Sequence, residues 1–266
     1  MLLSRILTAL ILAPLFIWAI FSMPTDYFSY LLLSFVALGA WEFTRLIKID
    51  QPFYRTLVVS GIIGCAFIAS AHAENLQTVL IVSVVWWGLN LYWVISYPKN
   101  IDSWYGSGII RVMGGVMLLA PMWVALSSLH ANYGNVYFLL LMLLIWGADT
   151  GAYFVGRAFG KRKLAPKISP GKSIEGVIGG TIFAVIIMLA FLQNQNIALQ
   201  SYAGYLILAV IISSVSVLGD LYESLFKRTS GIKDSGNILP GHGGILDRID
   251  SLTAAAPFFL LGLGLL

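Results

Sequence analysis

The residues of this sequence best suited to chemistry are aspartates that interrupt apolar segments of its second half. Asp149 lies in the segment LLIWGADTGAYFVG, and Asp220 follows a long apolar run in VSVLGDLYESLFKR. Asp247 and Asp250, three residues apart, come just before the last apolar run. A carboxylate at such depth in an apolar layer costs at least about 2.5 kcal/mol, so each acid is a candidate functional group. For Asp149, a helix cap or an ion pair with Arg157 is the alternative interpretation.

Asp220 belongs to a group of polar residues at helical spacing. Glu223, Ser224 and Lys227 follow it at i+3, i+4 and i+7, which places all four on one face of a helix. Carboxylate oxygens without histidine or cysteine nearby suit a hard cation such as Mg²⁺, which completes its shell with water and substrate phosphate. Zinc is not expected, because His242 has no second imidazole or thiolate near it in sequence. His242 is either a substrate contact or a loop histidine that bonds the backbone.

Two basic loops that contain glycine accompany these acids. The first, residues 157–173, leads into a helix whose N-terminal amides could accept an anion. Its residues 161–163 are assigned to membrane topology and to attraction by anionic lipid. Further along, Pro170 and Gly171 predict a turn that leaves Ser169 and Lys172 at the mouth of the helix.

The tripeptide 171–173 resembles the end of a phosphate-binding P-loop. That motif is excluded, because Pro166 occupies the place of its earlier glycine and no strand is expected before it. The second loop, residues 227–248, interleaves glycines with cations and acids. Glycines let backbone amides approach a ligand closely, as phosphate-binding loops do. The combination predicts a polyphosphate bound through Mg²⁺, with four cations close to it: Lys227, Arg228, Lys233 and Arg248.

Composition indicates which elements must position these loops. Of 266 residues, 59% are hydrophobic and 11% are charged, with a mean hydropathy of +0.87. These values exclude a soluble nucleic-acid-binding protein despite the net charge of +4, and the single Cys65 excludes an intramolecular disulfide. An all-α polytopic membrane protein of about nine transmembrane helices is predicted from the apolar runs. These runs are 6–23, 27–41, 56–73, 79–96, 112–129, 136–156, 174–192, 202–219 and 249–266.

The basic residues predict how the chain lies in the membrane. Every Lys and Arg except Arg5 falls on one side of the predicted spans, and by the positive-inside rule that side faces the cytoplasm. Residues 1–140 are expected to be mainly a scaffold of transmembrane helices, and residues 141–266 to form the catalytic part with both loops. Gly176 and Gly180 form a G-x-x-x-G pattern, which is interpreted as close helix packing within the chain rather than dimerisation.

The second loop resembles the signature of the phosphatidate cytidylyltransferases, also called CDP-diacylglycerol synthases. The matching residues are Ser224-Leu-Phe-Lys227-Arg228, Lys233-Asp234-Ser-Gly236 and Leu239-Pro-Gly-His242-Gly-Gly-Ile-Leu-Asp247-Arg248-Ile-Asp250. The segments 149–153 and 167–172 are also similar to the family, so the resemblance covers residues 140–266. It implies that CTP condenses with phosphatidate to give CDP-diacylglycerol and pyrophosphate, with Mg²⁺ and a second cation such as K⁺. It also implies a homodimer in a bacterial inner membrane, with the active site facing the cytoplasm.

The resemblance assigns roles to the candidate residues. Asp220 and Asp247 are expected to be metal ligands, with Asp149 and Asp250 as weaker candidates, and Asp220, Asp247, Lys227 and Arg248 are expected to be catalytic. The residues expected to bind substrate are Lys167, Ser169, Lys172, Ser224, Arg228, Lys233, Asp234, His242, Gly243 and Gly244. The alternatives are a CTP-dependent lipid (polyprenol) kinase, a secondary transporter and a lipid-binding scaffold.

Overall fold

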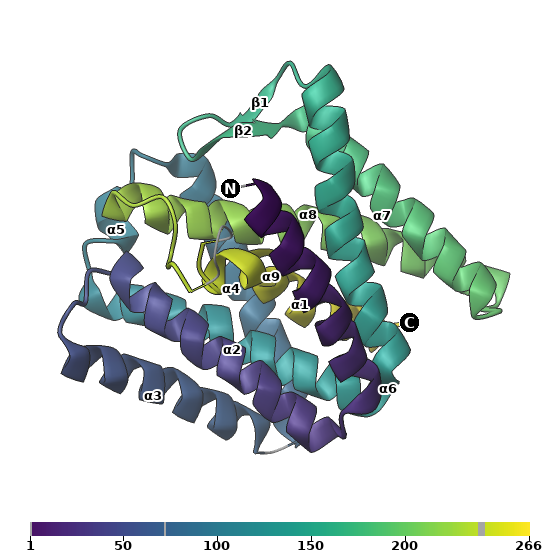
Figure 1. Ribbon diagram of the computed structural model, residues 1–266, viewed down its shortest axis with the longest axis horizontal. Helices are drawn as coiled ribbons and strands as arrows, with labels where there is room; N and C mark the ends of the chain where they lie inside the picture. The colour runs from purple at the N-terminus through teal and green to yellow at the C-terminus, as the bar shows by residue number, and fades with distance from the viewer. Residues whose placement is uncertain (1, 72, 239–242) are drawn as a thin grey trace.

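The computed structural model describes residues 2–71, 73–238 and 243–266, and it is almost entirely helical (Figure 1). The helices are α1 (Leu2–Ser22), α2 (Thr25–Leu46), α3 (Pro52–Ser70), α4 (Leu76–Ser96), α5 (Ile101–Trp104), α6 (Gly108–Phe159), α7 (Ile174–Asn194), α8 (Tyr202–Ser230) and α9 (Leu246–Leu263). Two short 3₁₀ turns, η1 (Ala73–Asn75) and η2 (Leu199–Ser201), precede α4 and α8. Each predicted apolar run coincides with a helix, apart from a few residues at its ends.

Helix α6 contains two of the predicted runs and is broken between them. At a rise of about 1.5 Å per residue, a straight helix of its 52 residues would far exceed the roughly 30 Å of a membrane core. Gly134 lies at the break with φ 79° and ψ −178°, a conformation that glycine adopts without the clash of a side chain. The segments before and after it run in different directions in Figure 1.

Within the described residues, six helical segments are long and apolar enough to cross a membrane: α2, α3, α4, α6, α7 and Leu199–Ser230, which includes α8. The apolar part of α1, Leu10–Ser22, is shorter, and α9 carries Asp247, Arg248 and Asp250 close to its start. The protein is therefore a helical, polytopic membrane protein. The count of nine crossings stays a prediction.

Helix α6 packs against α2, α3, α7 and α9, and α8 packs against α7 and α9. Helices α6 and α7 approach each other closely at the G-x-x-x-G pattern. A Cβ atom at Gly176 would lie 2.9 Å from the carbonyl oxygen of Ala152, and one at Gly180 would lie 2.5 Å from that of Ala148. The prediction that these glycines serve close packing within the chain is confirmed.

The segment before α7 differs from the expectation of a purely helical fold. Strands β1 (Lys163–Ala165) and β2 (Ser169–Ser173) form a small antiparallel sheet, and the turn between them lies at residues 166–168. Both the turn predicted at Pro170–Gly171 and the absence of a strand before α7 were therefore wrong. Pro170 fits in β2 because a strand of a two-stranded sheet has one free edge, where the missing N–H costs nothing. The P-loop interpretation remains excluded by Pro166.

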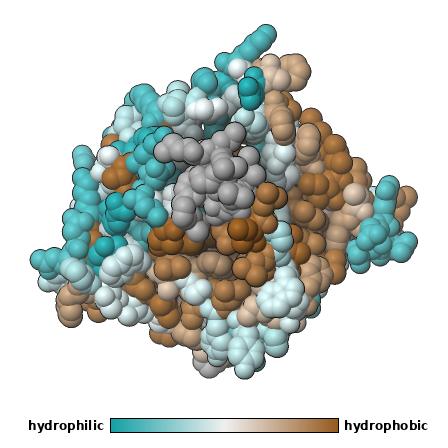
Figure 2. All heavy atoms as spheres, in the orientation of Figure 1, coloured by the Kyte–Doolittle hydropathy of each residue, from teal (hydrophilic) through white to brown (hydrophobic). Residues whose placement is uncertain are grey.

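The surface has the character expected of a protein surrounded by lipid. Figure 2 shows hydrophobic residues below and to the right of the centre of the molecule, and hydrophilic residues along its upper and left margins and in one cluster at the far right. On α7, Ile178, Ile182 and Ile186 are exposed at intervals of one helical turn. An apolar stripe of this kind indicates contact with a membrane or another helix rather than with water.

Candidate active site

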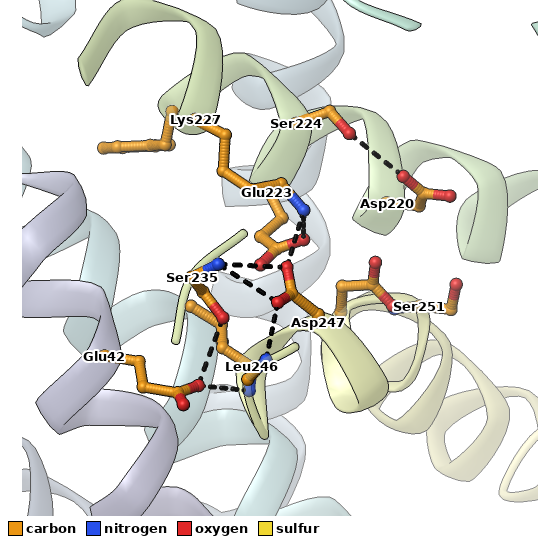
Figure 3. A network of polar contacts seen from close by, with 12 residues as sticks. Glu42, Asp220, Glu223, Ser224, Lys227, Ser235, Leu246, Asp247 and Ser251 are labelled. Carbon is orange, nitrogen blue, oxygen red and sulfur yellow. Dashed lines mark hydrogen bonds and ion pairs between the residues drawn. The ribbon is translucent and has the colours of Figure 1, made fainter. Parts of the chain in front are cut away.

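The polar face predicted on α8 is present and lies at the centre of a hydrogen-bonded network (Figure 3). The hydroxyl of Ser224 donates to Oδ1 of Asp220 at 3.2 Å, one helical turn away. The ammonium of Lys227 donates to Oε2 of Glu223 at 2.6 Å, also across one turn. All four residues therefore share one face of a single helix, as the i, i+3, i+4, i+7 spacing predicted.

Asp247 joins α8 to the loop before α9. Its Oδ1 accepts from Nζ of Lys227 at 2.8 Å, and its Oδ2 accepts from the backbone N–H of Ser235 at 3.0 Å and of Gly244 at 2.8 Å. The sequence placed Asp247 and Asp250 before the last helix, whereas α9 begins at Leu246 and includes both. An acid in the first turn of a helix is stabilised by the free N–H groups and the dipole there.

The small β-sheet is attached to α8 by two basic side chains. Nζ of Lys172, on β2, lies 2.7 Å from Oδ2 of Asp220. Nε of Arg228, near the end of α8, donates to the carbonyl oxygen of Ile168 at 2.9 Å. The hairpin thus brings Lys172 to the acid expected to be a metal ligand, and it does so from a strand rather than from the end of the predicted turn.

Asp220 lies within electrostatic reach of two of the other aspartates. Asp220 interacts with Asp149 of α6 and with Asp250 of α9, and Lys172 interacts with both of these acids. Neither alternative role for Asp149 is found among the described residues: no ion pair joins it to Arg157, which donates instead to the hydroxyl of Tyr153 at 3.1 Å, and it lies inside α6 rather than at a helix cap. Three different helices therefore present carboxylates to one region.

These carboxylates are compatible with a metal that takes few protein ligands. Within the described part of the chain, no group of three His, Cys, Asp or Glu side chains could hold a metal ion by itself. Mg²⁺ commonly takes one or two carboxylates and completes its shell with water and substrate phosphate, so the oxygen donors present fit it. Asp220 is best placed, because its side chain is 31% exposed and its partner Lys172 can turn to another anion.

Other predicted substrate-binding residues lie around this network. No hydrogen bond or ion pair engages the side chains of five of them in the portion of the chain that the structure describes: Lys167, Ser169, Lys233, Asp234 and Arg248. All of these except Ser169 are exposed. Gly243 has φ 84°, in the left-handed region that favours glycine. His242 lies outside the described residues.

The basic residues 161–163, assigned to lipid contact, are exposed, but one of them has a partner within the protein. Nε of Arg162 lies 2.9 Å from Oε1 of Glu175, in the first turn of α7. The backbone N–H groups of Lys161 and Arg162 also donate to the same carboxylate. Arg162 therefore helps to hold the start of β1, and Lys161 and Lys163 remain the cations assigned to lipid.

Two buried acids belong to this network although the sequence did not place them among the site residues. Glu223 is 2% exposed and shares Lys227 with Asp247. Glu42, also 2% exposed, belongs to α2, and its Oε2 accepts from Oγ of Ser235 at 3.1 Å and from the N–H of Leu246 at 2.8 Å.

The sequence contained a signal for Glu42, an acidic residue directly beside an apolar run, which is the same signal that identified the aspartates. The second apolar run was taken to end at residue 41, so Glu42 fell in a predicted loop. In the structure α2 continues to Leu46, which buries Glu42 inside the protein. Its hydrogen bonds to the second loop connect the part expected to be a scaffold, residues 1–140, with the part expected to be catalytic, residues 141–266. The division into these two parts stays a prediction.

Comparison with known proteins places this arrangement in a family. Residues 3–266 match the model of the cytidylyltransferase family. The chain is 42% identical to a phosphatidate cytidylyltransferase of Haemophilus influenzae, with 97% of each chain aligned. It is 44% identical to the phosphatidate cytidylyltransferase of Pseudomonas aeruginosa, over 97% of this chain and 96% of the other, and 32% identical to that of Bacillus subtilis, over 85% and 95%. With a match that extends over both loops and nearly all of the helices around them, this chain belongs to the cytidylyltransferase family.

Proposed function

We propose that this protein transfers the cytidylyl group of CTP to phosphatidate, giving CDP-diacylglycerol and pyrophosphate. The observation that carries the proposal is the convergence of Lys172, Asp220, Lys227 and Asp247, from β2, α8 and α9, at one polar site in an otherwise apolar protein. The family and the names of the aligned relatives support the same reaction.

The chemistry is an in-line displacement at phosphorus. A phosphate oxygen of phosphatidate attacks the α-phosphorus of CTP, the bond from that phosphorus to the oxygen bridging to the β-phosphate breaks, and pyrophosphate leaves. The attacking phosphate is already ionised, so no strong general base is required. The protein must bring two polyanions together and neutralise their charge, and positioning and electrostatics therefore carry most of the rate.

The cations of the site are suited to this task. Lys172 and Lys227 are held next to acids, so a phosphate oxygen that arrives in the site can take the place of a carboxylate oxygen as acceptor. Arg228, Lys233 and Arg248 are exposed around them and are proposed to hold the triphosphate. Arginine suits phosphate because its planar guanidinium can donate two parallel hydrogen bonds.

We include Mg²⁺ in the proposal, held first by Asp220 and Asp247, with Asp149 and Asp250 as further candidates. Bound there, Mg²⁺ would neutralise charge that develops on the pyrophosphate as it leaves. Asp247 already accepts hydrogen bonds from three N–H groups, so as a metal ligand it would have to share an oxygen between a donor and the metal. Asp220 has a single strong partner, Lys172. A second cation such as K⁺ rests on the family resemblance alone.

The proposal also includes the arrangement in the membrane. Nine crossings would place the loops 157–173 and 227–248 on the cytoplasmic side of a bacterial inner membrane, where CTP is available. The distribution of Lys and Arg and the bacterial origin of the aligned relatives support this orientation. A homodimer is proposed on the resemblance to the family.

Two other functions are less well supported. A lipid kinase would transfer the terminal phosphoryl group and release CDP, whereas the proposed reaction releases pyrophosphate. A secondary transporter would place its acids near the membrane midplane in corresponding halves of a repeat. Here the aspartates belong to α6, α8 and α9 and lie beside a polar hairpin and loop.

The test uses purified protein in detergent with cytosine-labelled CTP, phosphatidate and Mg²⁺. The proposal predicts a labelled lipid that forms only when phosphatidate is present, together with an equal amount of pyrophosphate. Release of CDP without a labelled lipid would contradict it and favour the kinase. Asp220→Asn is the matched control, because it keeps the shape of the side chain and removes the charge.

A further inference from the structure

Glu42 is a buried carboxylate that the proposed chemistry does not use. It comes from α2, far from the signature in sequence, and is 2% exposed. Its Oε2 accepts from Ser235, near the start of the loop between α8 and α9, and from Leu246, the first residue of α9. A single oxygen therefore holds together two points of the chain that are eleven residues apart.

The glycines of the signature fit around this carboxylate. A Cβ atom at Gly236 would overlap Oε1 of Glu42, and one at Gly244 would overlap Oε2 and the hydroxyl of Ser235. The N–H of Gly244 meanwhile donates to Asp247. Gly244 therefore lies between two acids, one from α2 and one from α9, and only a residue without a side chain fits there.

Ser235 connects the same two acids. Its hydroxyl donates to Glu42, its N–H donates to Asp247, and its carbonyl oxygen accepts from Arg45 at 3.2 Å. The residue is completely buried, and each of its polar groups is used. A shift of Glu42 would therefore move Ser235 and Leu246, and with them two of the groups that surround Asp247 and Lys227.

From these contacts we infer that Glu42 is a positioning residue for cytidylyl transfer, which fixes Ser235 and Leu246 so that Asp247 and Lys227 are held in place for the substrates. The inference rests on the proposed function for its effect on rate. Its structural part, the fixing of the loop, stands without that function and can be measured without substrate.

Three variants and one control test the inference. Glu42→Gln keeps the size of the side chain but offers a neutral acceptor, Glu42→Ala removes it, and Ser235→Ala removes one bond from the loop side. Val36→Ala is the control, because Val36 is a fully buried apolar residue of the same helix. We expect kcat to fall by roughly tenfold or more in Glu42→Ala, the change that corresponds to about 1.4 kcal/mol, and by less in Glu42→Gln. Val36→Ala should lower thermal stability and leave kcat of the folded protein near its native value.

Hydrogen exchange of the purified protein without substrate provides the decisive readout. Peptides that cover residues 232–238 should exchange faster in Glu42→Ala and Ser235→Ala than in the native protein, and at the native rate in Val36→Ala. The double variant with Glu42→Ala and Ser235→Ala should have the same kcat as the slower of the two single variants, because both substitutions remove the same contact. Native exchange in Glu42→Ala, or equally fast exchange in Val36→Ala, would overturn the inference. If the native protein made no CDP-diacylglycerol, the proposed function would fail while the exchange data still decided whether Glu42 fixes the loop.

Discussion

Replacing Lys227 by methionine should destabilise the protein and stop its turnover, and the structure gives the size of both effects. The Lys227 side chain is 13% exposed, and its ammonium is the shared partner of Glu223 and Asp247, whose side chains are 1% and 7% exposed. Methionine keeps most of the apolar stem but leaves both acids without their cation. Removing one partner of a buried ion pair costs about 3–5 kcal/mol. We therefore expect a clearly lower midpoint of thermal unfolding in detergent.

A second variant separates stability from turnover. In Lys227→Met with Glu223→Gln, one of the two uncompensated acids is gone, so part of the lost stability should return. Lys227 is proposed to contact the triphosphate, and loss of one such donor costs on the order of 10²-fold in kcat. The rate of CDP-diacylglycerol formation per folded protein should therefore stay low in both variants, and Glu223→Gln alone serves as the control.

Two results would refute this reasoning. Recovery of native kcat in the double variant would mean that Lys227 only neutralises the buried acids and does not act on substrate. Unchanged thermal stability in Lys227→Met would mean that Glu223 and Asp247 do not depend on its charge.

Three further predictions concern the metal, the topology and the nucleotide. Asp220→Asn should lower kcat by about 10²-fold or more and weaken Mg²⁺ binding measured by calorimetry, and near-native values would remove Asp220 from the metal site. In a cysteine-free background, a cysteine at Lys233 should resist an impermeant thiol reagent in intact cells while one at Asn194 reacts, and the reverse pattern would invert the topology. Arg248→Ala should raise the KM for CTP or lower kcat steeply. Lys163→Gln should only weaken the dependence of activity on anionic lipid, by about 1 kcal/mol at most. A larger change in the KM for CTP from Lys163→Gln than from Arg248→Ala would place the nucleotide on the other loop.

Local sequence patterns were sufficient for several features of this protein. Apolar runs gave the helices, because the length of a span is fixed by the membrane. The spacing of Asp220, Glu223, Ser224 and Lys227 gave one helix face, because the helical period is fixed. Lys172 reached the site even though its local structure was predicted incorrectly, since a turn and a short strand both deliver a side chain to the start of α7.

The features that the sequence did not reveal depend on contacts between distant segments. Glu42 bonds to residues about 200 positions away, and nothing near it in sequence indicates such a partner. Gly236 and Gly244 were interpreted as space for a ligand, whereas the carboxylate of Glu42 occupies part of that space. The interruption predicted between residues 129 and 136 is present at Gly134, but as a bend within one helical element and not as a loop, because a glycine between two apolar runs is consistent with either.

The transfer of the α-phosphorus of CTP to lipid is the central claim, and two labelled forms of CTP test it most directly. The purified protein is incubated with phosphatidate, Mg²⁺ and CTP that carries the label either at the α- or at the γ-phosphorus, and lipid and aqueous products are separated. The account predicts that the α-label appears in the lipid and the γ-label appears in pyrophosphate. A γ-label in the lipid, with the α-label left in CDP, would contradict it.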